Sequence, residues 1–108
     1  MIMDHKLKLM VVDDSPLFRT WLIRSLSADD RFQVVGYAVN ALDAQEKIPL
    51  LQPDMLTLDI EMPGMSGIDF LKKLLPSHPV PVILVSSLNL RVFDALEAGA
   101  VDFVRKPD

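Results

Sequence analysis

The chain has 108 residues, of which 50% are hydrophobic and 24% are charged, with no cysteine and a formal net charge of −4. This composition excludes an intrinsically disordered chain, and the length suits a single domain spanning residues 1–108. The lack of cysteine excludes disulfides and cysteine-ligated metal, and the mild negative charge argues against nucleic acid as a partner of this segment. No apolar run is long enough for membrane insertion and no signal peptide is evident, so we expect a soluble cytoplasmic domain.

Five short apolar runs rich in Val, Ile and Leu are spaced along the chain, and each predicts a β-strand. They are Leu9–Val12, Val34–Ala38, Met55–Ile60, Val80–Val85 and Val101–Val104. Because these runs are apolar throughout rather than alternating, they are typical of strands that are covered on both faces of a sheet.

The segment after the first run has the start signals of an amphipathic helix. Ser15 is a good N-cap, and Pro16 is a good first helical residue. The apolar residues that follow at intervals of four predict a stripe facing the core, made of Phe18, Leu22 and Leu26.

Three further helices are predicted between the later strands. Asn40 caps the second, which Pro49 should end or kink, and Ser66 caps the third. A short fourth helix is expected from about Leu90 to Ala98, closed by Gly99. The residues of the second and third helices predicted to face the core are Ala41, Ala44, Ile48, Ile68, Leu71 and Leu75.

The regular alternation of strands and helices predicts an α/β fold. We expect a doubly wound five-stranded parallel sheet with helices on both faces. In such sheets ligands bind beyond the carboxyl ends of the strands, at the point where the strand order reverses. The carboxyl ends of the predicted strands are therefore where functional residues should lie.

Polar and ionisable side chains lie at or just after the ends of four of these strands. Listed in chain order, they are Asp13 and Asp14, then Asp59 and Glu61, then Ser86 and Ser87, and finally Lys106. Because the ends of parallel strands meet at one edge of the sheet, we expect these groups to converge there.

Carboxylates that converge repel one another. A like-charged pair 4 Å apart costs about 4 kcal/mol at an effective dielectric constant of 20, so one acid stays protonated or a divalent cation binds. Oxygen ligands in a small cluster suit Mg²⁺, and the ammonium of Lys106 and the hydroxyl of Ser86 complete a receptor for a phosphoryl group. Asp59 is the lone acid of an apolar strand, so it is the best candidate for a nucleophile that forms an aspartyl phosphate.

The strings VVDDS, LDIEMPGMSG, LVSS and FVRKP stand in order at successive strand ends. This set resembles the receiver domain of two-component response regulators, and the resemblance covers Lys8 to Pro107. It implies a flavodoxin-like fold with strand order 2-1-3-4-5. The strings LDIEMPGMSGIDFL, PVILVSSL and ALEAGAVDFVRKP are most similar to the regulatory domain of the chemotaxis protein-glutamate methylesterase.

The resemblance also implies roles for the acids at the strand ends. Asp59 is then the phosphoacceptor, and Mg²⁺ is the cofactor. Asp14 is implied as a direct Mg²⁺ ligand, with Asp13 acting through water or a hydrogen bond. Asp59 completes the metal site together with the backbone carbonyl of Glu61.

The remaining implied roles concern the phosphoryl group and its consequences. Lys106 would bind the phosphate, Ser86 would be the switch hydroxyl, and Phe103 the switch aromatic residue. The implied partners are a sensor histidine kinase as phosphoryl donor and the protein's own output domain. The receiver segment itself is then no turnover enzyme beyond self-phosphorylation and dephosphorylation, whereas the full-length parent would be a protein-glutamate methylesterase/deamidase.

Two features depart from the subfamily pattern. Ser86 and Lys106 are only 20 positions apart, fewer than is usual there, so we expect a short fourth helix or a shortened loop before it. The chain stops at Asp108, where a fifth helix would begin, so we expect that helix to be missing and any effector domain to lie beyond this residue.

Two alternative functions stay open at this point. The first is a degenerate or stand-alone receiver that acts as a binding scaffold, which the short fourth helix favours and the intact set of acids disfavours. The second is a small Mg²⁺-dependent phosphatase with an aspartate nucleophile, in which Glu61 would serve as acid and base. The lack of room for a cap domain disfavours this second alternative.

Overall fold

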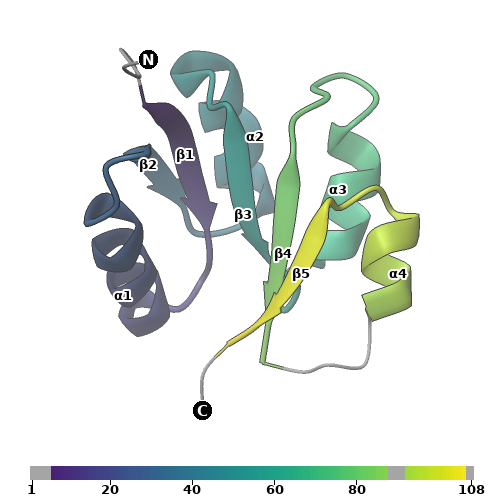
Figure 1. Ribbon diagram of the computed structural model, residues 1–108. Coiled ribbons are helices and arrows are strands. Elements are labelled where there is room, and N and C mark those ends of the chain that lie inside the picture. Colours follow the sequence, from purple (N-terminus) through teal and green to yellow (C-terminus); the bar gives the residue numbers. More distant parts are fainter. Residues whose placement is uncertain (1–5, 88–91, 107–108) are drawn as a thin grey trace.

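The computed structural model describes residues 6–87 and 92–106 and contains one five-stranded parallel sheet (Figure 1). The strands lie in the order β2-β1-β3-β4-β5, which confirms the predicted fold and strand order. The strands are β1 (Leu7–Val12), β2 (Phe32–Ala38), β3 (Met55–Asp59), β4 (Val82–Ser86) and β5 (Asp102–Arg105). The helices are α1 (Pro16–Ser27), α2 (Ala41–Leu51), α3 (Gly67–Leu74) and α4 (Val92–Glu97).

The main core lies between the sheet and the helices α2 and α3. Buried side chains of these helices share one cluster with every second residue of the central strands, such as Met10 and Val12 of β1. Of the residues of α2 and α3 predicted to face the core, Leu75 is partly buried and the others are buried, namely Ala41, Ala44, Ile48, Ile68 and Leu71. Helix α1 lies on the opposite face of the sheet, against β1 and β2 (Figure 1).

The predicted helix ends are largely confirmed. The side chains of Ser15, Asn40 and Ser66 each accept a hydrogen bond from a backbone N–H three residues later, at 3.3, 2.8 and 3.2 Å. Gly99 follows α4 with a φ of 106°, a left-handed conformation that favours glycine. The predicted start of this helix at Leu90 lies outside the described residues.

Several predicted boundaries were wrong by one or two residues. Strand β4 begins at Val82 rather than Val80, because Pro81 has no N–H to donate to the sheet. Strand β3 ends at Asp59 rather than Ile60. Pro49 does not end α2, which continues to Leu51 and closes at Gln52 with a φ of 48°. A proline this close to the C-terminus of a helix removes only one hydrogen bond from its last turns.

The prediction that α1 turns a stripe into the core is only partly right. Phe18, Leu22 and Leu26 are half-buried, no residue of this helix is fully buried, and Trp21 is 50% exposed. The helix contacts β1 and β2 at one side of the sheet, so much of its surface remains open. Across the described ranges, every helix is too short or too polar to cross a lipid bilayer.

Candidate functional site

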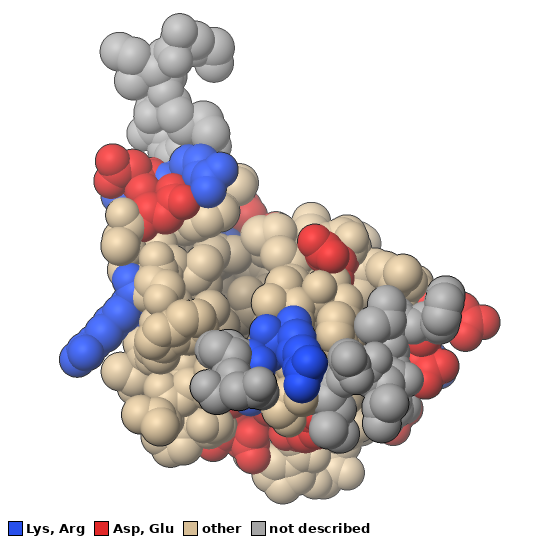
Figure 2. All heavy atoms as spheres, turned by 60° about the horizontal axis from the view of Figure 1, so that its bottom comes forward, with Lys and Arg blue, Asp and Glu red and all other residues tan. Residues whose placement is uncertain are grey.

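The predicted functional residues come together at the edge of the sheet where the parallel strands end. This edge is at the bottom of Figure 1, and Figure 2 turns it toward the viewer, with acidic and basic side chains both present on it. Asp13 directly follows β1, Asp59 and Ser86 end β3 and β4, and Lys106 directly follows β5. The local cause is that β1, β3 and β4 are buried up to their last residues, so the first polar side chains after them emerge at this edge.

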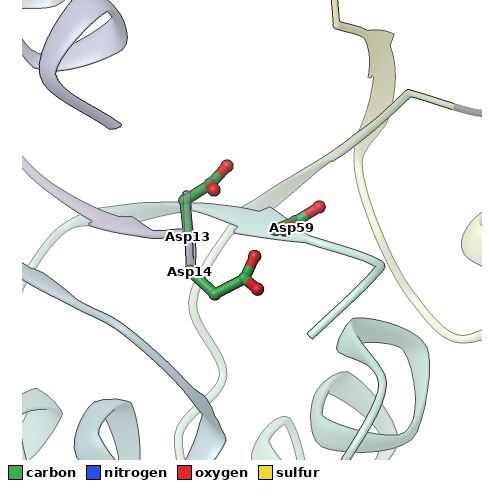
Figure 3. Close-up of side chains that lie close together, drawn as sticks. All are labelled: Asp13, Asp14 and Asp59. Carbon is green, nitrogen blue, oxygen red and sulfur yellow. The ribbon is translucent and has the colours of Figure 1, made fainter. Parts of the chain in front are cut away.

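Three carboxylates form a compact cluster there. Asp13, Asp14 and Asp59 each offer an oxygen within 4.8 Å of the others, and Figure 3 shows their side chains pointing to the same side. Asp13 and Asp59 are each only 1% exposed, whereas Asp14 is exposed. The cluster is therefore open to solvent on the side of Asp14.

The ammonium group of Lys106 partly neutralises this cluster. Its Nζ lies 3.0 Å from Asp13 Oδ2 and 3.5 Å from Asp59 Oδ1. Burial acts to lower the pKa of Lys106, but the two carboxylates outweigh burial and raise it, so the lysine is charged. The aromatic ring of Phe18 covers the ammonium, with its centroid 4.5 Å from Nζ. The backbone N–H of Lys106 also donates to the carbonyl of Ser86 at 2.7 Å, which fixes the lysine beside β4.

Asp59 has one carboxylate oxygen that the described part of the chain does not satisfy. Burial and, next, the charge of Asp13 raise its pKa to about 8, although Lys106 acts in the opposite direction. Its Oδ2 atom is buried and has no hydrogen-bond partner among the described residues. A buried carboxylate oxygen without a donor, beside two further carboxylates, is the donor set that a small hard cation prefers. These residues therefore fit Mg²⁺.

Asp13 and Asp14 differ in what holds them. The Oδ1 atom of Asp13 accepts from the backbone N–H of Ser15 at 2.8 Å, and its carbonyl accepts from the guanidinium of Arg19 at 2.9 Å. With Lys106 on its other oxygen, Asp13 is held in place by the protein itself. The side chain of Asp14 is the exposed one, which agrees with its predicted role as the direct metal ligand; that role stays a prediction.

Glu61 makes side-chain contacts that the sequence did not predict. Its Oε1 accepts hydrogen bonds from the hydroxyl of Ser86 and, at 3.5 Å, from the hydroxyl of Ser87. Its backbone N–H donates to Asp59 Oδ1 at 3.3 Å. Burial acts to raise the pKa of Glu61, but the Ser86 hydrogen bond and the other donors outweigh it and lower the pKa. The use of the Glu61 carbonyl as a metal ligand remains a prediction.

Gly67 lies against the backbone at the end of β3. A Cβ at this position would lie 2.1 Å from the backbone carbonyl oxygen of Asp59, so only glycine fits without a shift of backbone. Its N–H donates to the carbonyl of Ile60 at 2.8 Å, which ties the start of α3 to the end of β3. Phe103, the predicted switch residue, is half-buried and packs against the core; its role as a switch stays a prediction.

Sequence reasoning missed three contributors to this site, namely Phe18, Gly67 and the Glu61 side chain. The glycine has a signal, because a glycine directly after a helix cap is a poor helix former and indicates a close backbone approach. Phe18 was assigned to a core stripe, and only the tertiary structure shows that its ring reaches the lysine after β5. The contact of Glu61 joins two loops and has no local signal in the sequence.

Comparison with known proteins identifies the family. Residues 9–108 match the response regulator receiver domain. A protein-glutamate methylesterase/protein-glutamine glutaminase 2 of Syntrophomonas wolfei is 52% identical over 104 residues, which cover 96% of this chain and 30% of that protein. The corresponding protein of Hydrogenovibrio crunogenus is 49% identical over 106 residues, covering 94% of this chain and 28% of that protein.

Solved structures agree with this assignment. The response regulator domain of Thermotoga maritima CheB is 41% identical with a TM-score of 0.89, over 95% of this chain and 80% of that one. A chain from the CheX-CheY-BeF3-Mg+2 complex of Borrelia burgdorferi is 30% identical with a TM-score of 0.81, over 94% of this chain and 79% of that one. The chain spans about a third of the length of the curated relatives it matches. It belongs to the response regulator receiver domain family, and it is similar both to protein-glutamate methylesterases and to the response regulator domain of a CheB protein.

Proposed function

We propose that this domain, which spans residues 1–108, is a phosphorylation-activated signalling module. It accepts a phosphoryl group on Asp59 from a sensor histidine kinase, with Mg²⁺ bound at the carboxylate cluster. The observation that carries the proposal is the position of the Lys106 ammonium, 3.5 Å from Asp59 at the buried end of β3, beside two further acids. An ammonium and a hard-cation site flanking one carboxylate suit the transfer of a phosphoryl group to that carboxylate.

The chemical step uses residues that the fold already holds together. An Asp59 oxygen attacks phosphorus, the bond between phosphorus and the donor's leaving atom breaks, and the leaving group departs with that electron pair. The attack requires ionised Asp59, whose pKa is raised to about 8 by burial and Asp13. Mg²⁺ held by Asp13, Asp14 and Asp59 would supply positive charge that favours the ionised acid and balances the phosphoryl oxygens.

After transfer, the neighbouring side chains bind the new dianion. Lys106 exchanges part of its pairing with Asp13 for the phosphoryl oxygens, and Ser86 donates its hydroxyl to one of them. Movement of Ser86 at the end of β4 shifts the equilibrium of the domain between two conformations. Phe103, which packs against the core in β5, would take part in this change as the switch residue.

The activity of the attached output domain is proposed from the names of the similar proteins. Their names describe protein-glutamate methylesterases and protein-glutamine glutaminases, of which this chain matches about a third. We propose a cytoplasmic parent protein in which the receiver regulates an attached methylesterase domain that acts in chemotaxis. Nucleic acid and membrane are not expected as partners of this segment, given its net charge of −4.

Intact-mass spectrometry tests the phosphoryl transfer. The chain is incubated with acetyl phosphate with and without Mg²⁺, and we expect one base-labile phosphoryl group per chain that depends on the cation. Asp59→Asn should abolish the adduct, whereas Asp30→Asn, a matched change of an exposed acid away from the site, should not. An adduct that survives Asp59→Asn contradicts the proposal. Binding of a partner without any adduct would indicate a scaffold, and steady phosphate release from small phosphomonoesters would indicate a phosphatase.

A further inference from the structure

One contact at the site is not explained by phosphoryl transfer itself. The hydroxyl of Ser86 points to the carboxylate of Glu61, which also receives the hydroxyl of Ser87 at 3.5 Å. The two serines follow each other at the end of β4, whereas Glu61 belongs to the loop after β3. The backbone N–H of Glu61 is tied to Asp59 at 3.3 Å, so this loop is anchored at the phosphoacceptor. One acid thus joins both loops that flank Asp59.

The contact sets up a competition for one proton. A serine hydroxyl has a single hydrogen to donate, so a Ser86 hydroxyl that donates to Glu61 does not donate to a phosphoryl oxygen on Asp59. Both acceptors are anionic, and hydrogen bonds to charged acceptors are the stronger kind. Phosphorylation therefore has to break the contact between Ser86 and Glu61 before the hydroxyl becomes available.

We propose that Glu61 is a latch that holds the Ser86 hydroxyl at the end of β4 in the unphosphorylated arrangement. This inference rests on the proposed function and adds a positioning residue to it. The latch slows phosphorylation by the free energy needed to release Ser86 from Glu61. Its removal should leave the hydroxyl free to turn to the incoming phosphoryl group, at the cost of a less sharply defined resting state.

A double-mutant cycle distinguishes a latch from simple charge repulsion. The initial rate of adduct formation with acetyl phosphate and Mg²⁺ is measured for wild type, Glu61→Ala, Ser86→Ala and the double variant. We expect Glu61→Ala to be faster than wild type by about tenfold, the factor that corresponds to ~1.4 kcal/mol, the low end for a hydrogen bond to a charged group. In the Ser86→Ala background the same change should have little effect, because there is no hydroxyl to release.

The control for net charge is Glu46→Ala. It removes one exposed acid from the middle of α2 that is not a residue of the site. It should leave the rate at the wild-type value. Two results would overturn the latch, and each has its own meaning. An unchanged rate for Glu61→Ala shows that Glu61 does not restrain Ser86. An equal gain in the Ser86→Ala background shows that Glu61 acts only by repelling the donor.

A second measurement reads the latch without phosphorylation. In the unphosphorylated protein, Glu61→Ala should shift the backbone amide NMR signals of Ser86 and Ser87, whereas Glu46→Ala should leave them in place. Unchanged serine signals overturn the latch even if phosphorylation proceeds. If wild type forms no adduct at Asp59 but the serine signals shift, the proposed function fails while the latch contact stands.

Discussion

Lys106 lies closer to Asp13 than to Asp59, with Nζ–Oδ distances of 3.0 and 3.5 Å. The lysine that is expected to bind phosphate therefore has a structural partner before any phosphoryl group arrives. This pairing joins the first and last strands of the chain and neutralises one charge of a buried pair of acids. The charge balance of the site therefore sets the behaviour of variants at Lys106, Asp59 and Asp13.

Removal of the lysine charge should destabilise the domain. Lys106→Met keeps most of the side-chain length but leaves Asp13 and Asp59 without a cation, and loss of one partner of a buried ion pair is costly. In buffer with chelator we expect a loss of about 2–4 kcal/mol in the free energy of unfolding, measured by urea titration. Lys47→Met is the matched control, because its pair with Asp43 is more exposed and should contribute less than ~1 kcal/mol. Equal costs for the two variants would contradict the assigned importance of Lys106.

The raised pKa of Asp59 should make metal-free stability depend on pH. The folded chain holds this proton up to a pKa of about 8, whereas the unfolded chain releases it near 3.8, so the folded state binds more protons between these values. The contribution of Asp59 to the free energy of unfolding is therefore fully present at low pH and is lost as pH rises from about 4 to about 8. Asp59→Asn should be more stable than wild type at pH 7, by on the order of 4 kcal/mol, and the difference should shrink toward pH 4.

Urea titrations with chelator, at several pH values and for both proteins, measure this difference. Addition of Mg²⁺ at pH 7 should stabilise wild type and leave Asp59→Asn nearly unchanged, because only wild type offers the third carboxylate. A wild-type advantage at pH 7 without metal would refute the raised pKa.

Asp13 and Asp14 should separate into a structural and a metal-binding acid. Asp14→Asn is expected to weaken Mg²⁺ binding strongly with little loss of stability, since this side chain is exposed. Asp13→Asn is expected to cost about 1–3 kcal/mol, because it removes the partner of Lys106 and weakens the acceptor of the Ser15 N–H. Titration calorimetry with Mg²⁺ and urea unfolding provide the two measurements, and equal effects of the two changes on both would show that the division is wrong.

Gly67→Ala should disturb the backbone of Asp59 directly. The new methyl group would meet the Asp59 carbonyl oxygen at 2.1 Å, so either α3 or the end of β3 must shift. We expect a cost of about 1–3 kcal/mol in stability and a clear fall in the rate of phosphorylation by acetyl phosphate. Gly64→Ala is the comparison, because nothing lies within 4 Å of its Cβ although its φ is 84°. It should cost about 1–2 kcal/mol by backbone strain and leave the phosphorylation rate nearly intact.

Much of this fold and site follows from local sequence signals. Uninterrupted apolar runs and helix caps such as Ser15 and Ser66 are short-range patterns that predict the strands and helices. Because parallel strands end at one edge of the sheet, these elements in turn predict a cluster of acids beside a lysine. The remaining features depend on contacts between distant segments. The ring of Phe18 reaches Lys106, and the carboxylate of Glu61 reaches Ser86, only after the sheet has formed.

The errors have the same physical origin. The stripe of α1 was predicted to face the core because its spacing is helical, but spacing does not say how completely a neighbour covers the helix, and Phe18 stays half-buried. Pro49 was expected to end or kink α2, and its place in the last turns allows the helix to continue to Leu51. Such outcomes depend on packing around an element rather than on the element's own sequence.

The pairing of Asp13 with Lys106 has a consequence for folding. Its two members come from opposite ends of the chain, so the site can close only after β5 has joined the sheet, and such long-range contacts form late. Strand β5 is an edge strand with mostly exposed residues, the kind of element that detaches first in local unfolding. When it detaches, the ammonium leaves with it and the acids repel a phosphoryl group. Lys106 can stay beside the acids only while β5 remains paired in the sheet. The lifetime of that pairing therefore sets an upper limit on how long the site remains able to bind a phosphoryl group.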